Sequence, residues 1–261
     1  MSNTSKPKTT KSGLAIGAMT LALGLGELPQ AAHAQQQDSQ QPATAVTTAD
    51  TLTRRQQAII PVAAYAAAGD MPGLQRALNE GLDAGLTISE AKEVLLQLYA
   101  YAGFPRSLNA LAELMKVVEA RKQQGINDAP GREPGKPIPQ GEALLAAGTA
   151  NQTRLAGAPV GGPLFDFAPA ANEFLRSHLF GDIFERDNLD WQSRELATVG
   201  MLSAIAGAEP QLQAHIRISM NTGLTAAQLQ QLGNVLADRT DSTMASRARE
   251  ALARHLATLS Q

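Results

Sequence analysis

Apolar residues recur at spacings of three and four along most of the chain beyond residue 50, which is the pattern of amphipathic helices. The stretch with Leu108, Leu111, Met115 and Val118 shows this spacing clearly. Strand-like alternation of apolar and polar residues is rare, so the pattern predicts an all-α fold. The predicted helices cover about 57–68, 71–84, 88–101, 106–124, 169–180, 191–206, 210–221, 226–237 and 242–259.

Local signals mark several of the predicted helix ends. Thr53, Thr87 and Thr225 are each followed three residues later by Glu or Gln, which is the spacing of a capping box at a helix N-terminus. Gly103 and Pro105 predict a stop after the third helix, because neither residue continues a helix readily.

A short motif occurs twice in the chain at a separation of 138 residues. Gly-Leu-Thr stands at 85–87 and again at 223–225, each time between two predicted helices, and similar pairs stand upstream at 55–56 and 194–195. Gly-Leu-Thr is also a common joint between helices. Duplication explains the shared order of helices better, so we predict two repeats that pack as one unit to bury their apolar faces.

The density of proline and glycine divides the chain into further parts. We assign residues 50–125 to the first repeat, 126–167 to a Pro/Gly-rich connector, and 168–261 to the second repeat. The connector is predicted to hold one short helix near 142–147. Because about 40 residues is long for a loop in a compact domain, we expect an ordered arm across the surface or a part of the site.

The N-terminus has the three-part pattern of a secretory signal peptide. Lys6, Lys8 and Lys11 precede an apolar run at 14–25, and the sequence at 32–34 is Ala-His-Ala. We predict a cleaved signal at 1–34, a flexible lead-in at 35–49, and a periplasmic or secreted protein with no stable membrane insertion. An uncleaved membrane anchor is the alternative.

Composition excludes several classes of function. The 261 residues include 22 Lys and Arg against 24 Asp and Glu, and this net charge of −2 argues against a nucleic-acid partner. The chain has no cysteine, which rules out disulfides, Cys-ligated metals and thiol nucleophiles. A histidine-based metal site is not indicated, so we predict no metal.

Three segments resemble the carboxymuconolactone decarboxylase family, which also includes the alkylhydroperoxidase D group. They are Tyr-Ala-Tyr-Ala-Gly-Phe-Pro at 99–105, Arg-Glu-Leu at 194–196, and Glu-Pro-Gln-Leu-Gln-Ala-His at 209–215. The chain looks like the tandem-repeat branch of the family, which is often exported. The resemblance implies helical hairpins that form a homo-oligomer, here a trimer or a dimer of two-repeat chains.

The resemblance also implies what this chain does not do. Peroxidase members use a Cys-x-x-Cys pair followed four residues later by a histidine and supported by an upstream glutamate. If His215 is that histidine, Ala208 and Gln211 stand at the cysteine positions and Glu195 lies near the glutamate position. Without a thiolate, thiol peroxidase chemistry is excluded.

The decarboxylase members act without cofactor on a carboxylated butenolide, which implies acid–base chemistry. We therefore predict a cofactor-independent lyase or related acid–base enzyme acting on a small carboxylate or lactone. The alternative is a catalytically degenerate small-molecule binding or scaffold protein of the same fold, because each repeat lacks half of the family's polar positions.

We assign catalysis to His215 as proton donor, with Glu195 holding one tautomer of its ring. Substrate binding is assigned to a carboxylate clamp and to hydroxyl donors, namely Arg106 or Arg194 and Tyr99 or Tyr101. Alternatively, His215 is an ordinary helix histidine, and Arg194 and Glu195 form a structural ion pair.

Two further features bear on the site. Tyr99 and Tyr101 cannot face the same side of a helix, so at most one of them is expected in a pocket. His178 lies in a stretch, 178–187, that is both aromatic and charged. We expect His178 to line the substrate pocket or to lie in a subunit contact.

Overall fold

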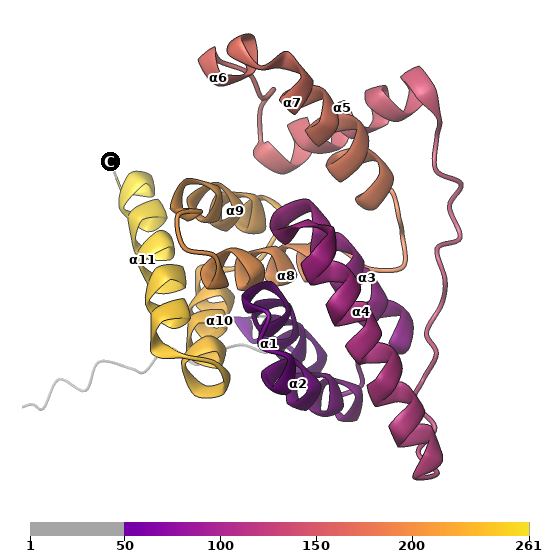
Figure 1. The fold of residues 1–261 in the computed structure, drawn as a ribbon. Coiled ribbons are helices and arrows are strands. Elements are labelled where there is room, and N and C mark those ends of the chain that lie inside the picture. The colour runs from indigo at the N-terminus through magenta and orange to yellow at the C-terminus, as the bar shows by residue number, and fades with distance from the viewer. Residues whose placement is uncertain (1–49, 261) are drawn as a thin grey trace, which may run out of the picture. The chain divides into compact units, whose positions relative to one another are not determined.

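The computed structural model describes residues 50–260, so the predicted signal and lead-in lie outside the described residues. The described part is helical throughout and contains no strand, which confirms the all-α prediction (Figure 1). Its α-helices are α1 (Arg54–Ala68), α2 (Met71–Asp83), α3 (Ile88–Gln97), α4 (Tyr99–Gln123), α5 (Gly141–Ala156), α6 (Pro163–Phe167), α7 (Pro169–Phe174), α8 (Trp191–Ala204), α9 (Glu209–Asn221), α10 (Ala226–Arg239) and α11 (Ser242–Leu259). A π-helical segment covers Leu175–Ile183.

The predicted capping boxes form at the start of α1, α3 and α10. In each one the threonine hydroxyl accepts the backbone N–H three residues later, and that residue's side chain accepts the threonine N–H. The preceding glycines, Gly85 and Gly223, have φ of 91° and 98°, a conformation that glycine adopts without strain. The two Gly-Leu-Thr joints therefore have the same local structure, and α1–α2–α3 matches α8–α9–α10 in order.

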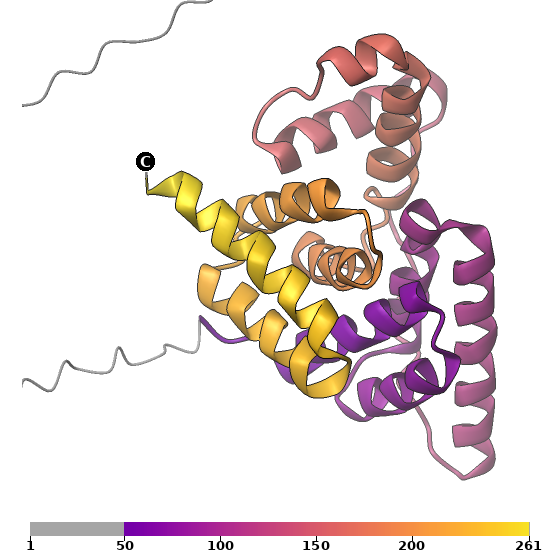
Figure 2. The same cartoon turned by 60° about the vertical axis from the view of Figure 1, so that its left-hand side comes forward.

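One apolar core joins the two predicted repeats, and α1 packs against α8 along its length. Figure 2 shows α8 nearly end-on, with α1, α9 and α11 around it. Small residues permit this close approach. A Cβ atom on Gly200 would lie 2.9 Å from the Ile60 carbonyl oxygen and 3.4 Å from the Ala63 side chain. The backbones of α1 and α8 therefore touch where most helix pairs are separated by side chains.

The connector is more helical than predicted. The expected short helix near 142–147 is the start of α5, which continues to Ala156, and α6 follows it. Residues 126–140 contain no helix, and polar contacts hold them in place. The Gly135 N–H donates to Asp187 at 2.9 Å, and Arg132 forms an ion pair with Asp187 at 3.0 Å. The segment is thus an ordered arm fixed to the loop before α8.

The predicted stop at Gly103 is confirmed, because its φ of 80° and ψ of 162° are not helical, and Pro105 lies in the first turn of the helical stretch that follows. Two other predicted helices need correction. The helix expected at 88–101 is divided, since α3 ends at Gln97 and α4 begins at Tyr99. The helix expected at 169–180 is α7 followed by the π-helical segment, which runs on to Ile183. That segment packs so closely on α5 that a Cβ atom on Gly148 of α5 would overlap the Arg176 carbonyl oxygen.

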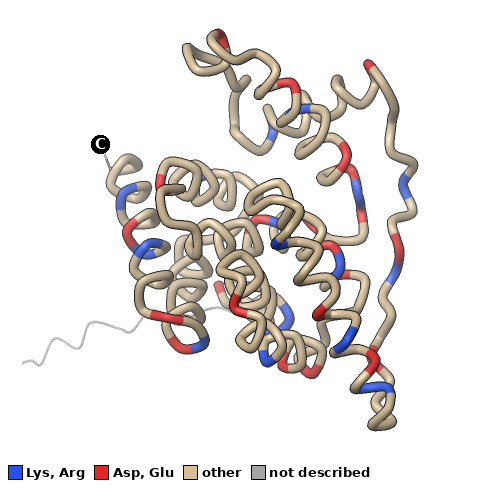
Figure 3. Tube along the Cα trace, in the orientation of Figure 1, with Lys and Arg blue, Asp and Glu red and all other residues tan. Residues whose placement is uncertain are grey.

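Charged positions of both signs are interspersed along the described helices and the arm (Figure 3). Within the described residues, no helix is long and apolar enough to cross a membrane.

Candidate active site

A carboxylate–histidine pair is buried between α8 and α9. The Nδ1 atom of His215 lies 2.8 Å from Oε2 of Glu195. Glu195 is fully buried and His215 is 7% exposed. The Gln192 amide donates to the Thr222 carbonyl oxygen at 3.0 Å, which fixes the antiparallel register of the two helices. The hairpin thus brings together two side chains that are 20 residues apart in sequence.

The geometry assigns the proton positions of this pair. Because a carboxylate only accepts hydrogen bonds, Nδ1 of His215 carries the proton directed at Glu195. Nε2 makes no hydrogen bond within the described residues. Nε2 is therefore the atom that can accept or deliver a proton, and the negative Glu195 stabilises the imidazolium that results.

Tyr101 completes the buried cluster. Its ring meets the His215 ring edge-on, with centroids 5.5 Å apart and an interplanar angle of 77°. The Tyr101 hydroxyl and Oε1 of Glu195 are buried without hydrogen-bond partners in the described part of the chain. Burial, followed by the negative charge of Glu195, raises the pKa of Tyr101, so the phenol stays protonated at neutral pH. The site therefore contains an unused hydrogen-bond donor next to an acid–base pair.

Arg194 precedes Glu195 but points away from the pair. Its guanidinium lies 3.0 Å from Glu93 of α3 and donates to the Gln97 side chain at 3.2 Å. Arg194 is fully buried, and Arg186 binds the same Glu93 carboxylate at 2.6 Å. Arg194 therefore forms a structural ion pair, but its partner is Glu93; the alternative pair of Arg194 with Glu195 is wrong, because Glu195 binds His215 instead.

Arg106 also lies away from the buried pair. Its guanidinium donates to the Ala68 carbonyl oxygen at the C-terminal end of α1. A positive side chain is favourable there because unpaired carbonyls collect at the C-terminus of a helix. Neither arginine assigned to the carboxylate clamp contacts Glu195 or His215.

The two tyrosines diverge, as their spacing predicts. Tyr99 stacks on Phe104, with ring centroids 4.5 Å apart, and its hydroxyl contacts Nε2 of His178. Nδ1 of His178 lies 2.6 Å from Oδ2 of Asp182. The structure thus brings Tyr99 and His178 together in a second cluster, separate from Glu195 and His215. Asp182 was missed by sequence reasoning, although its spacing of four from His178 is a usable signal.

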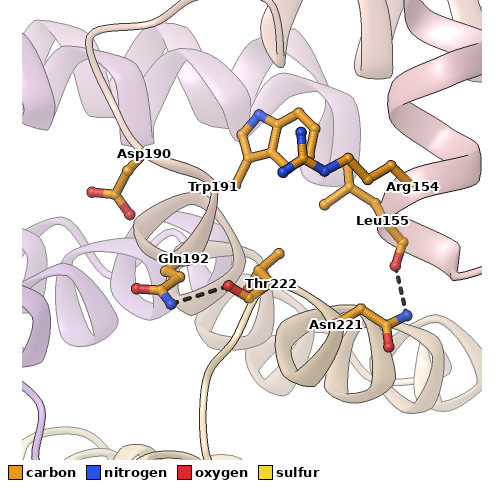
Figure 4. A pocket seen from close by; sticks show the side chains of 7 residues that line it. All are labelled: Arg154, Leu155, Asp190, Trp191, Gln192, Asn221 and Thr222. Carbon is orange, nitrogen blue, oxygen red and sulfur yellow. Dashed lines mark hydrogen bonds between the residues drawn. The ribbon is translucent and has the colours of Figure 1, made fainter. Parts of the chain in front are cut away.

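A pocket of about 370 Å³, with both polar and apolar lining, lies where α8 begins and α9 ends. Figure 4 shows the Arg154 guanidinium lying over the Trp191 ring, at 4.9 Å from its centroid. Arg154 makes no ion pair within the described residues, so its donors are available. The remaining lining residues are Leu155, Asp190, Gln192, Asn221 and Thr222. Sequence reasoning missed Arg154 because it lies in the predicted connector.

In the part of the chain that the structure describes, no group of three or more His, Asp or Glu side chains is placed to hold a metal ion. Glu195, His215 and Tyr101 are the candidate chemical groups of the buried cluster.

The fold and site define an all-α protein with two similar helical units and one buried acid–base pair. Residues 41–115 and 169–254 each match the carboxymuconolactone decarboxylase family, and together these matches cover more than half of the chain. The chain therefore belongs to the carboxymuconolactone decarboxylase family, and the two separate matches agree with a tandem repeat. A comparison with curated proteins found no match.

Proposed function

We propose that this protein is a cofactor-independent acid–base enzyme, of the carboxy-lyase type, that acts on a small carboxylate or lactone. The observation that carries the proposal is the buried pair of Glu195 and His215, joined at 2.8 Å. Histidine changes its charge near neutral pH, and a buried carboxylate partner fixes its tautomer. The arrangement suits a proton transfer at Nε2.

The side chains would divide the reaction as follows. When the carbon–carboxylate bond breaks, its electron pair stays on the substrate carbon and carbon dioxide leaves. The protonated Nε2 of His215 then gives its proton to that carbon, and Glu195 stabilises the imidazolium until the transfer. The neutral Tyr101 hydroxyl donates a hydrogen bond to the oxygen that gains negative charge.

The substrate carboxylate needs a cation, and Arg154 is a better candidate than Arg106 or Arg194. Both of the latter are engaged in contacts within the protein. Arg154 lies in the pocket beside Trp191, one helical turn of α8 before Glu195, although none of Glu195, His215 and Tyr101 lines that pocket. The guanidinium presents a planar array of donors that suits a carboxylate.

The test is turnover of small lactones and keto acids, followed by NMR of substrate and product. The wild-type chain and a His255→Gln control, altered at a buried histidine of α11, are expected to convert the same substrate. His215→Gln should lower kcat by about 10²–10⁴-fold, the usual contribution of a general acid. Equal turnover by His215→Gln and wild type would remove His215 from the mechanism.

A small-molecule binding or scaffold function is the second candidate. It is favoured by the burial of Arg194 with Glu93, which removes the predicted carboxylate clamp from the site. On this alternative, a lactone or carboxylate binds but is not converted by the wild-type chain. Binding measured by calorimetry without turnover would therefore support this function.

We also propose that the chain forms a homo-oligomer, a dimer or trimer, through the outer face of α4. Met115 is 68% exposed there, beside a mainly apolar groove of about 720 Å³ that includes Leu111 and Val118. A second copy would remove this apolar surface from water. Sedimentation velocity of the full chain measures its oligomeric state.

Export to the periplasm or medium remains a proposal that rests on the sequence of residues 1–34. If the signal is cleaved as predicted, the mature protein begins at Gln35. N-terminal sequencing of the exported protein tests this prediction, and a chain that retains Lys6, Lys8 and Lys11 would contradict it.

A further inference from the structure

A second cavity, of about 380 Å³, lies between the start of α4, the arm and the π-helical segment. Most of its wall is apolar, with Leu96, Leu108 and Ile183 among the lining residues. None of Glu195, His215 and Tyr101 lines it, so the cavity is separate from the candidate active site. An apolar cavity of this size accommodates a small ring compound.

Three polar side chains on the wall of this cavity form a connected relay. The Asp182 carboxylate accepts from Nδ1 of His178 at 2.6 Å, and the Tyr99 hydroxyl donates to Nε2 of His178. The carboxylate fixes the imidazole tautomer in which Nε2 is the basic atom. The Tyr99 oxygen keeps lone pairs that can accept a hydrogen bond from a ligand in the cavity.

The backbone places these groups on the cavity wall. His178 and Asp182 lie in the π-helical segment, and such segments occur frequently at functional sites. The π-stacking of Tyr99 on Phe104, with planes within 9°, holds the phenol in one orientation. The side chains of His178 and Asp182 are 52% and 39% exposed, so a small molecule can reach them from solvent.

Arg186 adds a cation to the same wall. Its Nε and Nη2 atoms bind both oxygens of Glu93 at distances between 2.6 and 3.0 Å. Nη1 makes no hydrogen bond within the described residues, and Arg186 lines the cavity. A negative oxygen formed in the cavity would therefore have a positive group nearby.

We propose that this cavity binds a small, largely apolar ring compound that carries an acidic hydroxyl group, such as a phenol or an enol. The ligand hydroxyl gives its proton to the Tyr99 oxygen while the Tyr99 proton passes to Nε2 of His178. The products are the ligand oxyanion, a neutral tyrosine and an imidazolium paired with Asp182. No electron is transferred and no bond other than O–H and N–H changes.

The probe for this site is 4-nitrophenol, whose ionised form absorbs visible light and whose neutral form does not. At a fixed pH at which the free phenol is mostly neutral, the wild-type chain should increase the ionised fraction in a saturable way. We expect the ionisation constant of the bound phenol to rise about tenfold, which is one pKa unit. His255→Gln, a control away from the cavity, should behave as wild type.

Two variants separate the relay from simple apolar binding. Tyr99→Phe keeps the aromatic ring and its stacking but removes the hydroxyl, and His178→Gln removes the basic nitrogen. In both variants, the bound phenol should lose the tenfold rise in ionisation constant. Circular dichroism and the unfolding midpoint verify that each variant is folded. Absence of binding by wild type, or an undiminished rise in folded Tyr99→Phe, overturns the proposal.

Discussion

The buried carboxylate of Glu93 offers the sharpest test of how the two repeats are held together. It lies between two arginines, at 2.6 Å from Arg186 and 3.0 Å from Arg194. The side chains of Glu93 and Arg194 are 3% and 0% exposed. Glu93→Gln keeps the shape of the side chain and removes its charge. Arg194 then remains a buried cation without a counter-ion.

The burial of Arg194 sets the expected loss in the free energy of unfolding. Removing one partner of a buried ion pair costs about 3–5 kcal/mol, because the other charge stays desolvated. Arg186 is partly exposed and can turn to water, so its share of the loss is small. We therefore expect Glu93→Gln to lower the free energy of unfolding by about 3 kcal/mol or more. Glu133→Gln breaks an exposed pair with Lys92 and should cost less than about 1 kcal/mol.

The assay is urea unfolding of the full chain at several pH values. Burial raises the pKa of Glu93, but the hydrogen bond from Arg186 and the charge of Arg194 outweigh it and hold the pKa below its ordinary 4.5. The stabilisation is therefore fully present above about pH 4.5 and is lost as pH falls through the folded-state pKa. The difference in the free energy of unfolding between wild type and Glu93→Gln should therefore become smaller at acid pH. The reasoning is refuted if Glu93→Gln lowers the free energy of unfolding by less than about 1 kcal/mol at pH 7. It is also refuted if the difference from wild type stays the same at acid pH.

Three further predictions follow from contacts described above. Gly200→Leu should lower the free energy of unfolding by at least about 2 kcal/mol, measured by thermal denaturation, because its side chain would enter the contact with Ile60. Arg154→Gln should raise the KM for a carboxylate substrate with little change in kcat; equal KM values would place substrate binding elsewhere. Met115→Lys should shift the sedimentation coefficient toward that of a single chain, and an unchanged coefficient would exclude this face of α4 from the interface.

The helix ends that the sequence predicts well are those with side-chain signals. Thr53, Thr87 and Thr225 each form the capping box that their spacing indicates. The start of α5 was expected near residue 142, but its continuation to Ala156 was missed, because Gly148, Thr149 and Asn151 are weak helix formers. The π-helical segment was missed because apolar periodicity is matched to 3.6 residues per turn. A single sequence thus predicts helix ends that side chains cap, but it does not predict a local change from α-helical to π-helical backbone.

In the candidate site, too, the contact within one hairpin could be predicted from the sequence and the contact between the repeats could not. Glu195 and His215 lie on one hairpin, so the spacing of family motifs could suggest that they meet. Arg194 is bound by Glu93, which is 101 residues away in sequence and on the other repeat. No pattern within either repeat indicates that contact. The role of Arg194 therefore depends on how α3 and α8 pack, which a single sequence does not reveal.

The different orientations of Arg194 and Glu195 follow from helix geometry. Neighbouring residues on an α-helix point about 100° apart, so Arg194 faces Glu93 of α3 while Glu195 faces His215 of α9. The ion pair thus holds the first turns of α8 against the first repeat at the level where Glu195 meets its histidine. If the pair positions Glu195, Glu93→Gln should lower turnover beyond what its fraction of folded protein explains. Turnover that simply follows the folded fraction would show that the ion pair only stabilises the fold.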